Sequence, residues 1–355
     1  MPKPISLKIG CNFDPALLPG LAALNAAYPE APWRINELYG SLASVNPIGT
    51  ARPTFRLQDG DADDLARYAI AAKAVGMGIN YTLNVSMVDP RELKAKEAEI
   101  VAFLEFLMRI GIVRVTVAHP LVAKLVNDNS ALPIELSTIM QIRHPRQLRQ
   151  LKERVPNIQK LCLDVFANRD AMLLHSLKDT AKELGITLES IANEFCVYEC
   201  PDRNQCYDLH ALNLTKDDTK LFGHYPMGNC IRERLVNPIE WLYARFILPQ
   251  WMPAYYATFD IRSFKITGRT HPTAYILKVA DIYMSGAFSG NLLELWADVA
   301  NIGRLEAEYQ APRTVLDMAK IRADFLDFYF IPRPFSETME AAYLTEVLKA
   351  CHVVP

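Results

Sequence analysis

The amino-acid sequence predicts a (β/α)8 barrel of the TIM type. Eight short runs have the β-branched and aromatic content of strands, and segments with helical periodicity fill the intervals between them. A barrel of eight such units takes about 250 residues, and the chain has 355. The alternation and the length therefore predict one closed parallel sheet with helices around it.

Each predicted element is bounded by turn residues or by a change of periodicity. The predicted strands are Ser6–Phe13, Arg34–Tyr39, Gly78–Val85, Val113–Ala118, Ile134–Gln141, Gln159–Val165, Thr187–Phe195 and Ser263–Thr267. The clearest predicted helices are Asp61–Val75, Glu92–Gly111, His144–Arg154 and Arg169–Leu184. The repeating pattern is complete by about residue 290, so we assign residues 1–290 to the barrel.

A long insertion, residues 196–260, separates the seventh predicted strand from the eighth. Active sites of such barrels lie at the C-terminal ends of the strands, and the insertion leaves that end of the seventh strand. We therefore expect it to lie over the barrel mouth. Residues 291–355 have helical periodicity throughout, as in VLDMAKIRADFLDFYF and EAAYLTEVLKA, and are predicted to form a helical C-terminal extension.

The composition is that of an ordinary globular protein, with 50% hydrophobic residues and a net charge of −2. No run of 18 apolar residues predicts a membrane span, and the N-terminus MPKPISLKIG lacks the apolar core of a signal peptide. These features predict a cytoplasmic location. The near-neutral charge without a basic run argues against a nucleic-acid partner, because phosphate contacts require clustered lysine and arginine.

Four of the seven cysteines lie close together in the insertion with the spacing C-x3-C-x5-C-x23-C: Cys196, Cys200, Cys206 and Cys230. Clustered thiols in a reducing compartment are typical metal ligands. Only the first pair fits a zinc ribbon, and the spacing does not fit the C-x3-C-x2-C motif of radical enzymes that use S-adenosylmethionine. The pattern leaves two alternatives open, a four-iron cluster and a four-thiolate zinc site.

Other residues are candidates to replace one of these ligands. His210 and His224 flank the cysteines, and imidazole can take the place of a thiolate on iron or zinc. Cys11 ends the first predicted strand and is a further candidate for the barrel mouth. Cys162 and Cys351 are expected to be packing residues, since free cysteine behaves as a small buried hydrophobe.

Polar residues at the predicted strand ends are candidates for substrate binding and catalysis, because these ends converge on one face of a barrel. Asn193 and Glu194 precede the first clustered cysteine, and Lys265 and Arg269 lie on and just after the eighth strand; we take these four as candidate catalytic residues. The candidate substrate-binding residues are Tyr39, Asn84, His119, Arg143, Asn168 and Arg169. The alternative role for each is the capping or ordering of a loop.

Three segments together resemble a known family: NEFCVYECPDR, the later NC-I-R, and FKITGR at Phe264–Arg269. They are similar to motifs of the collagenase-like peptidase family U-32, and the resemblance covers roughly residues 5–290. It implies a 4Fe-4S cluster on four cysteines, as in the paired proteins of oxygen-independent ubiquinone hydroxylation and in proteins that hydroxylate RNA bases. The chain departs from the better-known members in its cysteine spacing, and some relatives have histidine near the place of Cys206.

Three classes of function follow. The resemblance implies an iron-sulfur enzyme that hydroxylates, or otherwise modifies by redox chemistry, a small molecule, peptide or base. The second class is a non-catalytic, metal-stabilised subunit of a biosynthetic complex. The third is a peptidase, as the family name implies, although the sequence has no G-x-S-x-G or H-E-x-x-H motif. The cations Lys265, Arg269 and Arg143 favour an anionic substrate, and the resemblance implies a homologous partner subunit or a homodimer.

Overall fold

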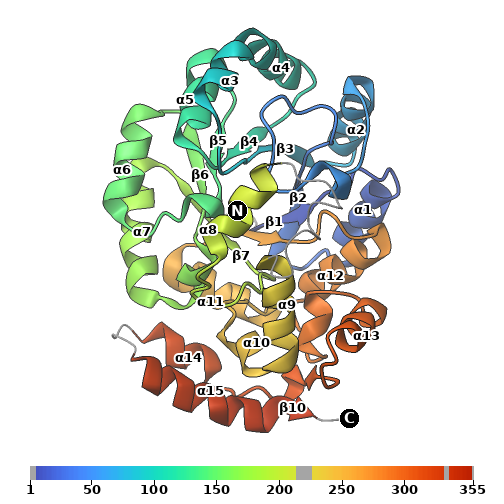
Figure 1. Cartoon of the computed structure of the whole chain (residues 1–355), viewed down its shortest axis with the longest axis vertical. Helices are drawn as coiled ribbons and strands as arrows, with labels where there is room; N and C mark the ends of the chain where they lie inside the picture. The colour runs from blue at the N-terminus through green and yellow to red at the C-terminus, as the bar shows by residue number, and fades with distance from the viewer. Residues whose placement is uncertain (1–4, 213–225, 332–335, 354–355) are drawn as a thin grey trace.

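The computed structural model describes residues 5–212, 226–331 and 336–353. Eight parallel strands close into a barrel in sequence order, which confirms the predicted fold (Figure 1). The strands are β1 (Ile5–Gly10), β2 (Trp33–Gly40), β3 (Gly78–Leu83), β4 (Arg114–Val117), β5 (Ile134–Leu136), β6 (Ile158–Cys162), β7 (Thr187–Ile191) and β8 (Ser263–Ile266). The barrel closes through β1 and β8, where Lys8 is the register partner of Lys265.

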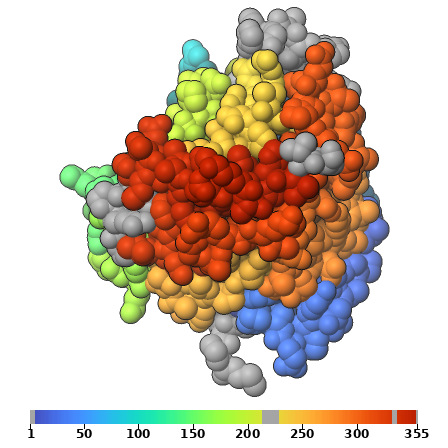
Figure 2. All heavy atoms as spheres, turned by 90° about the horizontal axis from the view of Figure 1, so that it is seen from below, coloured from blue at the N-terminus to red at the C-terminus, as the bar shows by residue number. Residues whose placement is uncertain are grey.

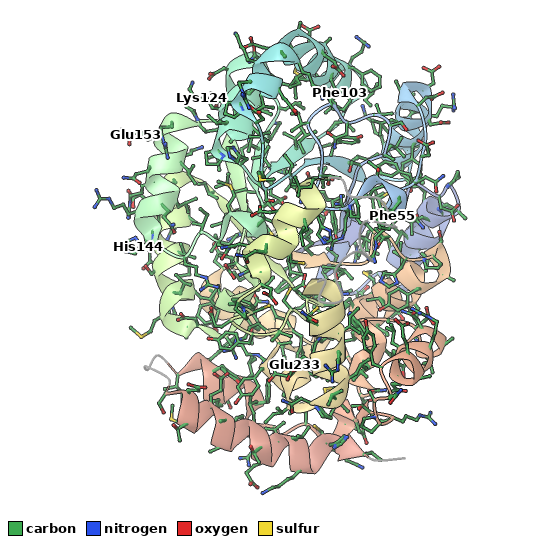
Figure 3. The ribbon with its side chains drawn as sticks, viewed as in Figure 1. Phe55, Phe103, Lys124, His144, Glu153 and Glu233 are labelled. Atoms are coloured by element: carbon green, nitrogen blue, oxygen red, sulfur yellow. The ribbon has the colours of Figure 1, made fainter. Side chains whose placement is uncertain are left out.

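Helices surround the barrel on its outside (Figure 1). They are α1 (Leu17–Ala27), α2 (Ala62–Ala74), α3 (Pro90–Ala95), α4 (Glu97–Arg109), α5 (Pro120–Asn129), α6 (Pro145–Arg154), α7 (Ala171–Leu184) and α12 (Thr273–Ser285). Short 3-10 turns follow several strands: η1 (Thr54–Arg56), η2 (Thr138–Met140) and η3 (Val165–Arg169). Charged side chains such as Lys124 and Glu153 lie on the outer helices, exposed to solvent (Figure 3).

Local sequence signals fix where these helices begin and end. Asp61 and Asp64 form a reciprocal capping box at the start of α2, which satisfies two backbone N–H groups that the helix cannot pair itself. His144 caps α6, and Pro145 occupies its first position, where no N–H is needed. Gly185 ends α7 in the left-handed conformation, at φ 65°.

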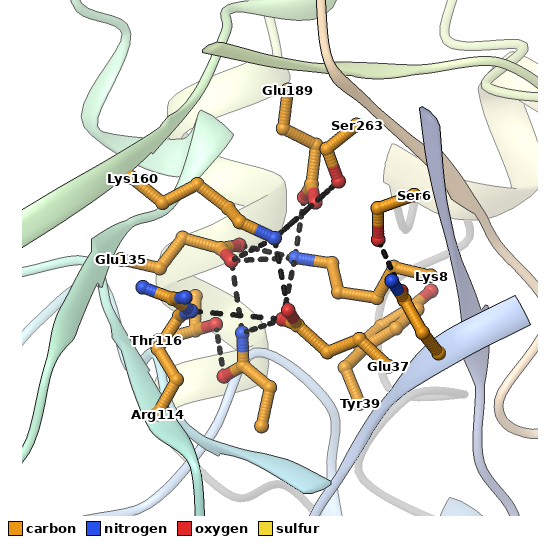
Figure 4. A network of polar contacts seen from close by, with 12 residues as sticks. Ser6, Lys8, Glu37, Tyr39, Arg114, Thr116, Glu135, Lys160, Glu189 and Ser263 are labelled. Carbon is orange, nitrogen blue, oxygen red and sulfur yellow. Dashed lines mark hydrogen bonds and ion pairs between the residues drawn. The ribbon is translucent and has the colours of Figure 1, made fainter. Parts of the chain in front are cut away.

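The interior of the barrel is charged, whereas the layer between strands and helices is apolar. Lys8 is fully buried and contacts Glu135 at 2.5 Å and, closer still, Glu189 (Figure 4). Lys160 lies 3.0 Å from Glu37 and 3.2 Å from Glu189. Burial alone would lower the pKa of Lys8, but the surrounding carboxylates outweigh it and raise that pKa above its ordinary value.

A small group of potential metal ligands in this interior is better described as an ion-pair site. One oxygen or sulfur atom each of Glu135, Cys162 and Glu189 lies within 4.8 Å of the others. The ammonium group of Lys8 contacts both carboxylates and supplies the positive charge that they require. The network therefore forms a polar floor beneath the barrel mouth.

The insertion between β7 and β8 is helical. It contains α8 (Arg203–Ala211), α9 (Pro226–Val236), α10 (Ile239–Tyr243), η5 (Pro249–Trp251) and α11 (Met252–Phe259). In Figure 1, α8 and α9 lie over the centre of the barrel.

The C-terminal extension is largely helical, as predicted, and lies as a band across one face of the molecule (Figure 2). Its elements are η6 (Leu292–Leu295), α13 (Val299–Glu308), β9 (Val315–Leu316), η7 (Met318–Lys320), α14 (Phe325–Phe330), α15 (Glu337–Cys351) and β10 (His352–Val353). The antiparallel pair of β9 and β10 was not predicted. In the described part of the chain, every helix is too short or too polar to cross a membrane.

Candidate functional site

A cavity of about 460 Å³ lies at the C-terminal ends of the barrel strands, beneath the insertion. This volume is within the range of small-molecule sites, roughly 300–1,000 Å³. The candidate residues that line it are Tyr39, Asn84, Asn193, Glu194, Cys196, Cys200, Cys206, Cys230, Lys265 and Arg269. The fold thus brings all four clustered cysteines and all four candidate catalytic residues to one place.

The four cysteines come from three segments of the insertion. Cys196 and Cys200 lie on the loop that follows β7, Cys206 lies on α8, and Cys230 lies on α9. All four are partly buried, and none forms a disulfide. Between the first two, Glu199 has a left-handed backbone at φ 49°, which turns the loop so that both thiols reach the cavity.

The distances between the four sulfur atoms can be compared with those that a single zinc ion requires. Thiolates around one zinc ion, with Zn–S bonds of about 2.3 Å, lie roughly 3.8 Å apart. Among the described residues, no three of the four sulfur atoms lie within 4.8 Å of one another. A four-iron cluster binds each thiolate to a different iron and therefore needs a wider set of ligands. The donor set is thus soft and unpaired by disulfides.

The reserve ligands are not all placed near the cavity. His210 lines it, and its Nε2 lies 4.0 Å from the sulfur of Cys206. Burial, followed by the charge of Arg52, lowers the pKa of His210 to about 3, so its ring is neutral and able to bind a metal. Cys11 does not line the cavity; it is buried beside the hydroxyl of Tyr68. His224 lies outside the described residues.

Positive charge dominates the lining of the cavity. Its cations are Arg52, Arg56, Arg203, Arg234, Lys265, Arg269 and Arg304, and its carboxylates are Glu194 and Asp202. Burial raises the pKa of Cys206 to about 11, and the neighbouring Cys230 adds to the effect. The cysteines can therefore be deprotonated here only if positive charge, from a metal group and from the arginines, stabilises the thiolates.

Two of these arginines are fixed against the cysteine segments. Arg203 contacts the buried Asp164 at 3.0 Å, and its guanidinium lies 4.4 Å from the centre of the Phe166 ring. Arg234 donates to the carbonyl of Cys230 at 3.0 Å and stacks 5.0 Å from the ring of Trp241. Because both guanidinium groups are held in place, their charges are preorganised beside the sulfur atoms.

Lys265 and Arg269 are buried cations without a carboxylate partner among the described residues. Lys265 is 5% exposed, and its Nζ lies 4.0 Å from the centre of the Tyr39 ring. Burial, followed by the charge of Lys8, lowers the pKa of Lys265. Arg269 is 8% exposed and donates to the hydroxyls of Thr82 and Thr50 at 2.5 Å and 2.9 Å.

The backbone around Arg269 is closely fitted. Burial and the charge of Arg52 lower the pKa of Arg269 to about 10. Gly268 has φ 129°, a conformation that other residues rarely adopt, and it turns the chain out of β8. A Cβ atom added to Gly10 would lie 2.6 Å from the backbone nitrogen of Arg269. These two glycines set the position of the guanidinium at the mouth.

Asn193 and Asn84 line the cavity but also hold the backbone together. The Asn193 side chain donates to the carbonyls of Thr267 and Leu295 and accepts from the Thr267 N–H at 2.6 Å. Asn84 accepts from the hydroxyl of Thr50 at 2.7 Å. Glu194 accepts only from the N–H of the next residue, at 3.0 Å, among the described contacts. Its carboxylate therefore retains free acceptor positions toward the cavity.

The structure places four candidate substrate-binding residues outside the lining of this cavity. His119 caps α5 by accepting from the N–H of Leu121. Asn168 is buried and donates to two backbone carbonyls at 2.8 Å. Arg143 pairs with Asp164 at 3.0 Å, and Arg169 donates to a backbone carbonyl at 2.5 Å. Each follows a strand, but its side chain is directed to the loop layer rather than to the barrel axis.

Sequence reasoning missed the cavity residues Arg52, Arg203, Arg234 and His271. For two of them a signal was present, because Arg203 closes the NEFCVYECPDR segment and Arg234 follows the last clustered cysteine by one helical turn. The interior network also had a signal, since each of the eight barrel strands carries at least one charged or amide residue.

Comparisons with known proteins give limited similarities. No family model matches the chain. The chain is 25% identical over 249 residues to an uncharacterized protease of Methanocaldococcus jannaschii, a match that covers 70% of this chain and 72% of that protein. This similarity supports a resemblance to proteins described as proteases.

Solved structures are similar at low sequence identity. A U-32 peptidase is 11% identical with a TM-score of 0.47, covering 63% of this chain and 84% of that one. A D-psicose 3-epimerase of Clostridium cellulolyticum is 12% identical with a TM-score of 0.40, covering 96% of this chain and 99% of that one.

Proposed function

We propose that the chain is an iron-sulfur enzyme of the U-32 peptidase-like family. Its reaction would be an oxygen-independent hydroxylation, or a related redox modification, of a small anionic molecule or peptide. One observation carries the proposal: four cysteines line the same cavity at the barrel mouth as Lys265 and Arg269, two buried cations that have no carboxylate partner among the described residues.

The chain's own residues have three tasks in this proposal. Cys196, Cys200, Cys206 and Cys230 would hold a 4Fe-4S cluster, which supplies electron transfer or polarises a substrate when bound. Arg203 and Arg234 offset the negative charge of the thiolates and fix the loops that carry them. The partly enclosed cavity limits water, so these charges act in a low dielectric.

Lys265 and Arg269 would hold the anionic group of the substrate. The planar guanidinium of Arg269 can form two parallel hydrogen bonds to a carboxylate, and its charge is not already neutralised. Lys265 lies deeper, next to Tyr39, with a lowered pKa that suits it to hold or release a proton at Nζ. Glu194, which also lines the cavity, would contribute a carboxylate beside the cysteine loop.

The remaining features of the proposal follow from the sequence. A cytoplasmic location keeps the thiols reduced, and the resemblance implies a homologous partner subunit or a second copy of this chain. A zinc site is the alternative cofactor, and a non-catalytic subunit is the alternative role. A peptidase is the third alternative and would need an activated nucleophile or a metal-bound water. In the described cavity lining, the thiol of Cys206 lies 4.0 Å from Nε2 of His210.

The test is anaerobic purification followed by metal analysis and spectroscopy. We expect about four irons and four sulfides per chain, a broad visible absorption band, and an electron paramagnetic resonance signal after reduction. Replacing any one of the four cavity cysteines by alanine should remove the visible band. Cys351→Ala is the matched control, because Cys351 is a buried packing residue of α15, and it should keep the band. Stoichiometric zinc without a visible band in iron-replete cells would overturn the proposal.

A further inference from the structure

A second cavity, of about 520 Å³, lies behind the cysteine loop. Its walls come from η3 with the start of α7, the loop between Cys196 and Cys200, and the C-terminal helices α14 and α15, with Arg143 and Arg245 added from two other segments. We propose that this cavity binds a small carboxylate with a planar, apolar body. The inference goes beyond the proposed function and does not depend on which metal the cysteines hold.

Arg169 is the residue that would recognise the carboxylate. It lines the cavity and is 4% exposed. One of its terminal nitrogens, Nη1, donates to the Leu242 carbonyl, whereas Nη2 has no hydrogen-bond partner among the described residues. Its guanidinium is flanked by the rings of Phe246, Phe325 and Tyr329 at 4.6–4.9 Å. A buried cation with an unpaired donor, on a side chain that lines a cavity, is suited to an anionic ligand.

The other two arginines of the wall are paired with carboxylates, so Arg169 stands apart. Arg245 is paired with Glu340 through both of its terminal nitrogens. Arg143 contacts Glu199 at 3.3 Å. Asp170, the third carboxylate of the lining, is exposed and caps α7. Among the described residues, Arg169 is therefore the arginine of this lining that has no carboxylate partner, and its guanidinium fits a ligand with a single negative charge.

The rest of the wall indicates the body of the ligand. The rings of Phe166 and Tyr198 meet edge to face at 5.3 Å, and the ring of Tyr329 lines the same space. Met172 and Leu173 add aliphatic surface. Aromatic walls favour flat, apolar groups, which can stack on a ring face or meet its edge. A carboxylate on an aromatic ring has the required combination of charge and shape.

The position of the cavity connects it to the metal site. Tyr198 and Glu199 belong to its wall and lie between two of the clustered cysteines. Asp164 contacts Arg143 in the second cavity and Arg203 in the first. An occupant would therefore contact the loop that carries Cys196 and Cys200 without entering the barrel mouth. This arrangement fits an effector that orders the loop.

Calorimetric titration of the full-length, anaerobically purified protein with benzoate tests the proposal. We expect saturable binding of one benzoate per chain, at least tenfold tighter than that of the neutral benzamide. Arg169→Met should weaken benzoate binding at least tenfold. Met172→Glu provides a second variant that should fold normally, because Met172 is exposed at the second position of α7. Its added negative charge at the rim should weaken binding about fivefold.

Two controls locate the binding. Leu121→Glu places the same charge at the second position of another helix, α5, on an exposed residue, and should leave benzoate binding unchanged. Arg269→Met removes the guanidinium of the barrel mouth and should also leave it unchanged. The proposal is wrong if benzoate does not bind, if benzamide binds equally well, or if Met172→Glu has no effect. It is also wrong if Arg269→Met abolishes binding, because benzoate then occupies the barrel mouth.

Discussion

Lys8 and Lys265 offer a direct test of which interior charges serve the fold. The two lysines are register partners on neighbouring strands, both are buried, and both face the ring of Tyr39. Lys8 is held by the carboxylates of Glu135 and Glu189, whereas Lys265 has no such partner among the described residues. We therefore expect Lys8→Met and Lys265→Met to have very different effects on stability, although the chemical change is the same.

The size of the difference follows from these contacts. Lys8→Met leaves Glu135 and Glu189 with Lys160, at 4.0 Å and 3.2 Å, as their nearest cation. Removing one partner of a buried ion pair costs about 3–5 kcal/mol. With an unfolding entropy of about 2.1 cal/mol/K per residue, this lowers Tm by about 4–7 °C for 355 residues. Lys265→Met loses a cation–π contact but also an unpaired buried charge, so its stability should stay within about 1 kcal/mol of the parent.

The assay is urea unfolding under anaerobic conditions, followed by tryptophan fluorescence, with the midpoint and the slope compared for the three proteins. Lys265→Met should also abolish turnover once a substrate is known, while it keeps the visible spectrum of the cluster. If Lys265→Met destabilises the protein as much as Lys8→Met does, Lys265 belongs to the structural network. The proposed anion site at the barrel mouth would then be wrong.

Three further predictions concern other contacts. The pKa of Lys265 is lower in the folded protein than its ordinary value of 10.5. At pH values between the folded-state pKa and 10.5, the unfolded chain therefore binds more protons at this lysine than the folded protein does. The free energy of unfolding should rise with pH across that window, and Lys265→Met should lack this rise. Gly10→Ala should cost about 1–3 kcal/mol in urea unfolding, since its Cβ would meet the Arg269 backbone at 2.6 Å. Glu340→Gln should cost about 3–5 kcal/mol by breaking a buried ion pair, whereas the exposed Glu308→Gln should cost under about 0.5.

Each of these predictions has an outcome that contradicts it. A pH profile of Lys265→Met that parallels the parent would show that the lysine does not titrate differently on unfolding. Gly303 is an exposed glycine of α13 with no atom within 4 Å of an added Cβ, so Gly303→Ala should be neutral or slightly stabilising. If Gly10→Ala and Gly303→Ala lowered the free energy of unfolding equally, the close approach of the Gly10 and Arg269 backbones would not be the cause. Equal losses for the two glutamate variants would argue against burial as the cause.

The barrel was predictable because its alternation of strand and helix patterns repeats eight times. The ends of the strands were less predictable. The run Thr187–Phe195 was predicted as one strand, but β7 ends at Ile191 and apolar residues continue into the loop. The ribbon of β9 and β10 was missed because two residues per strand are too few to show a period of two.

The candidate site was predictable in part, because four cysteines and a lysine within a strand are visible without coordinates. The direction of a side chain after a strand end is not visible. Asn193 follows the end of β7 by two residues and lines the barrel mouth, whereas Asn168 and Arg169 lie in and at the end of the turn η3 after β6, which directs them away from the mouth. The contribution of Arg52 could not be predicted either, because it depends on how the long segment between β2 and α2 folds back over the cavity.

The contact between α15 and the cysteine loop has a consequence for biosynthesis. Arg245 stacks 3.6 Å from the ring of Tyr198, next to Cys196 and Cys200, and is itself held by Glu340 of the C-terminal helix. During translation the cysteines leave the ribosome well before α15 does, since chains grow at about 5–20 residues per second. The loop therefore remains without its final support for several seconds or more. A nascent chain at that stage therefore presents the thiols of Cys196 and Cys200 before Glu340 can fix Arg245 beside them.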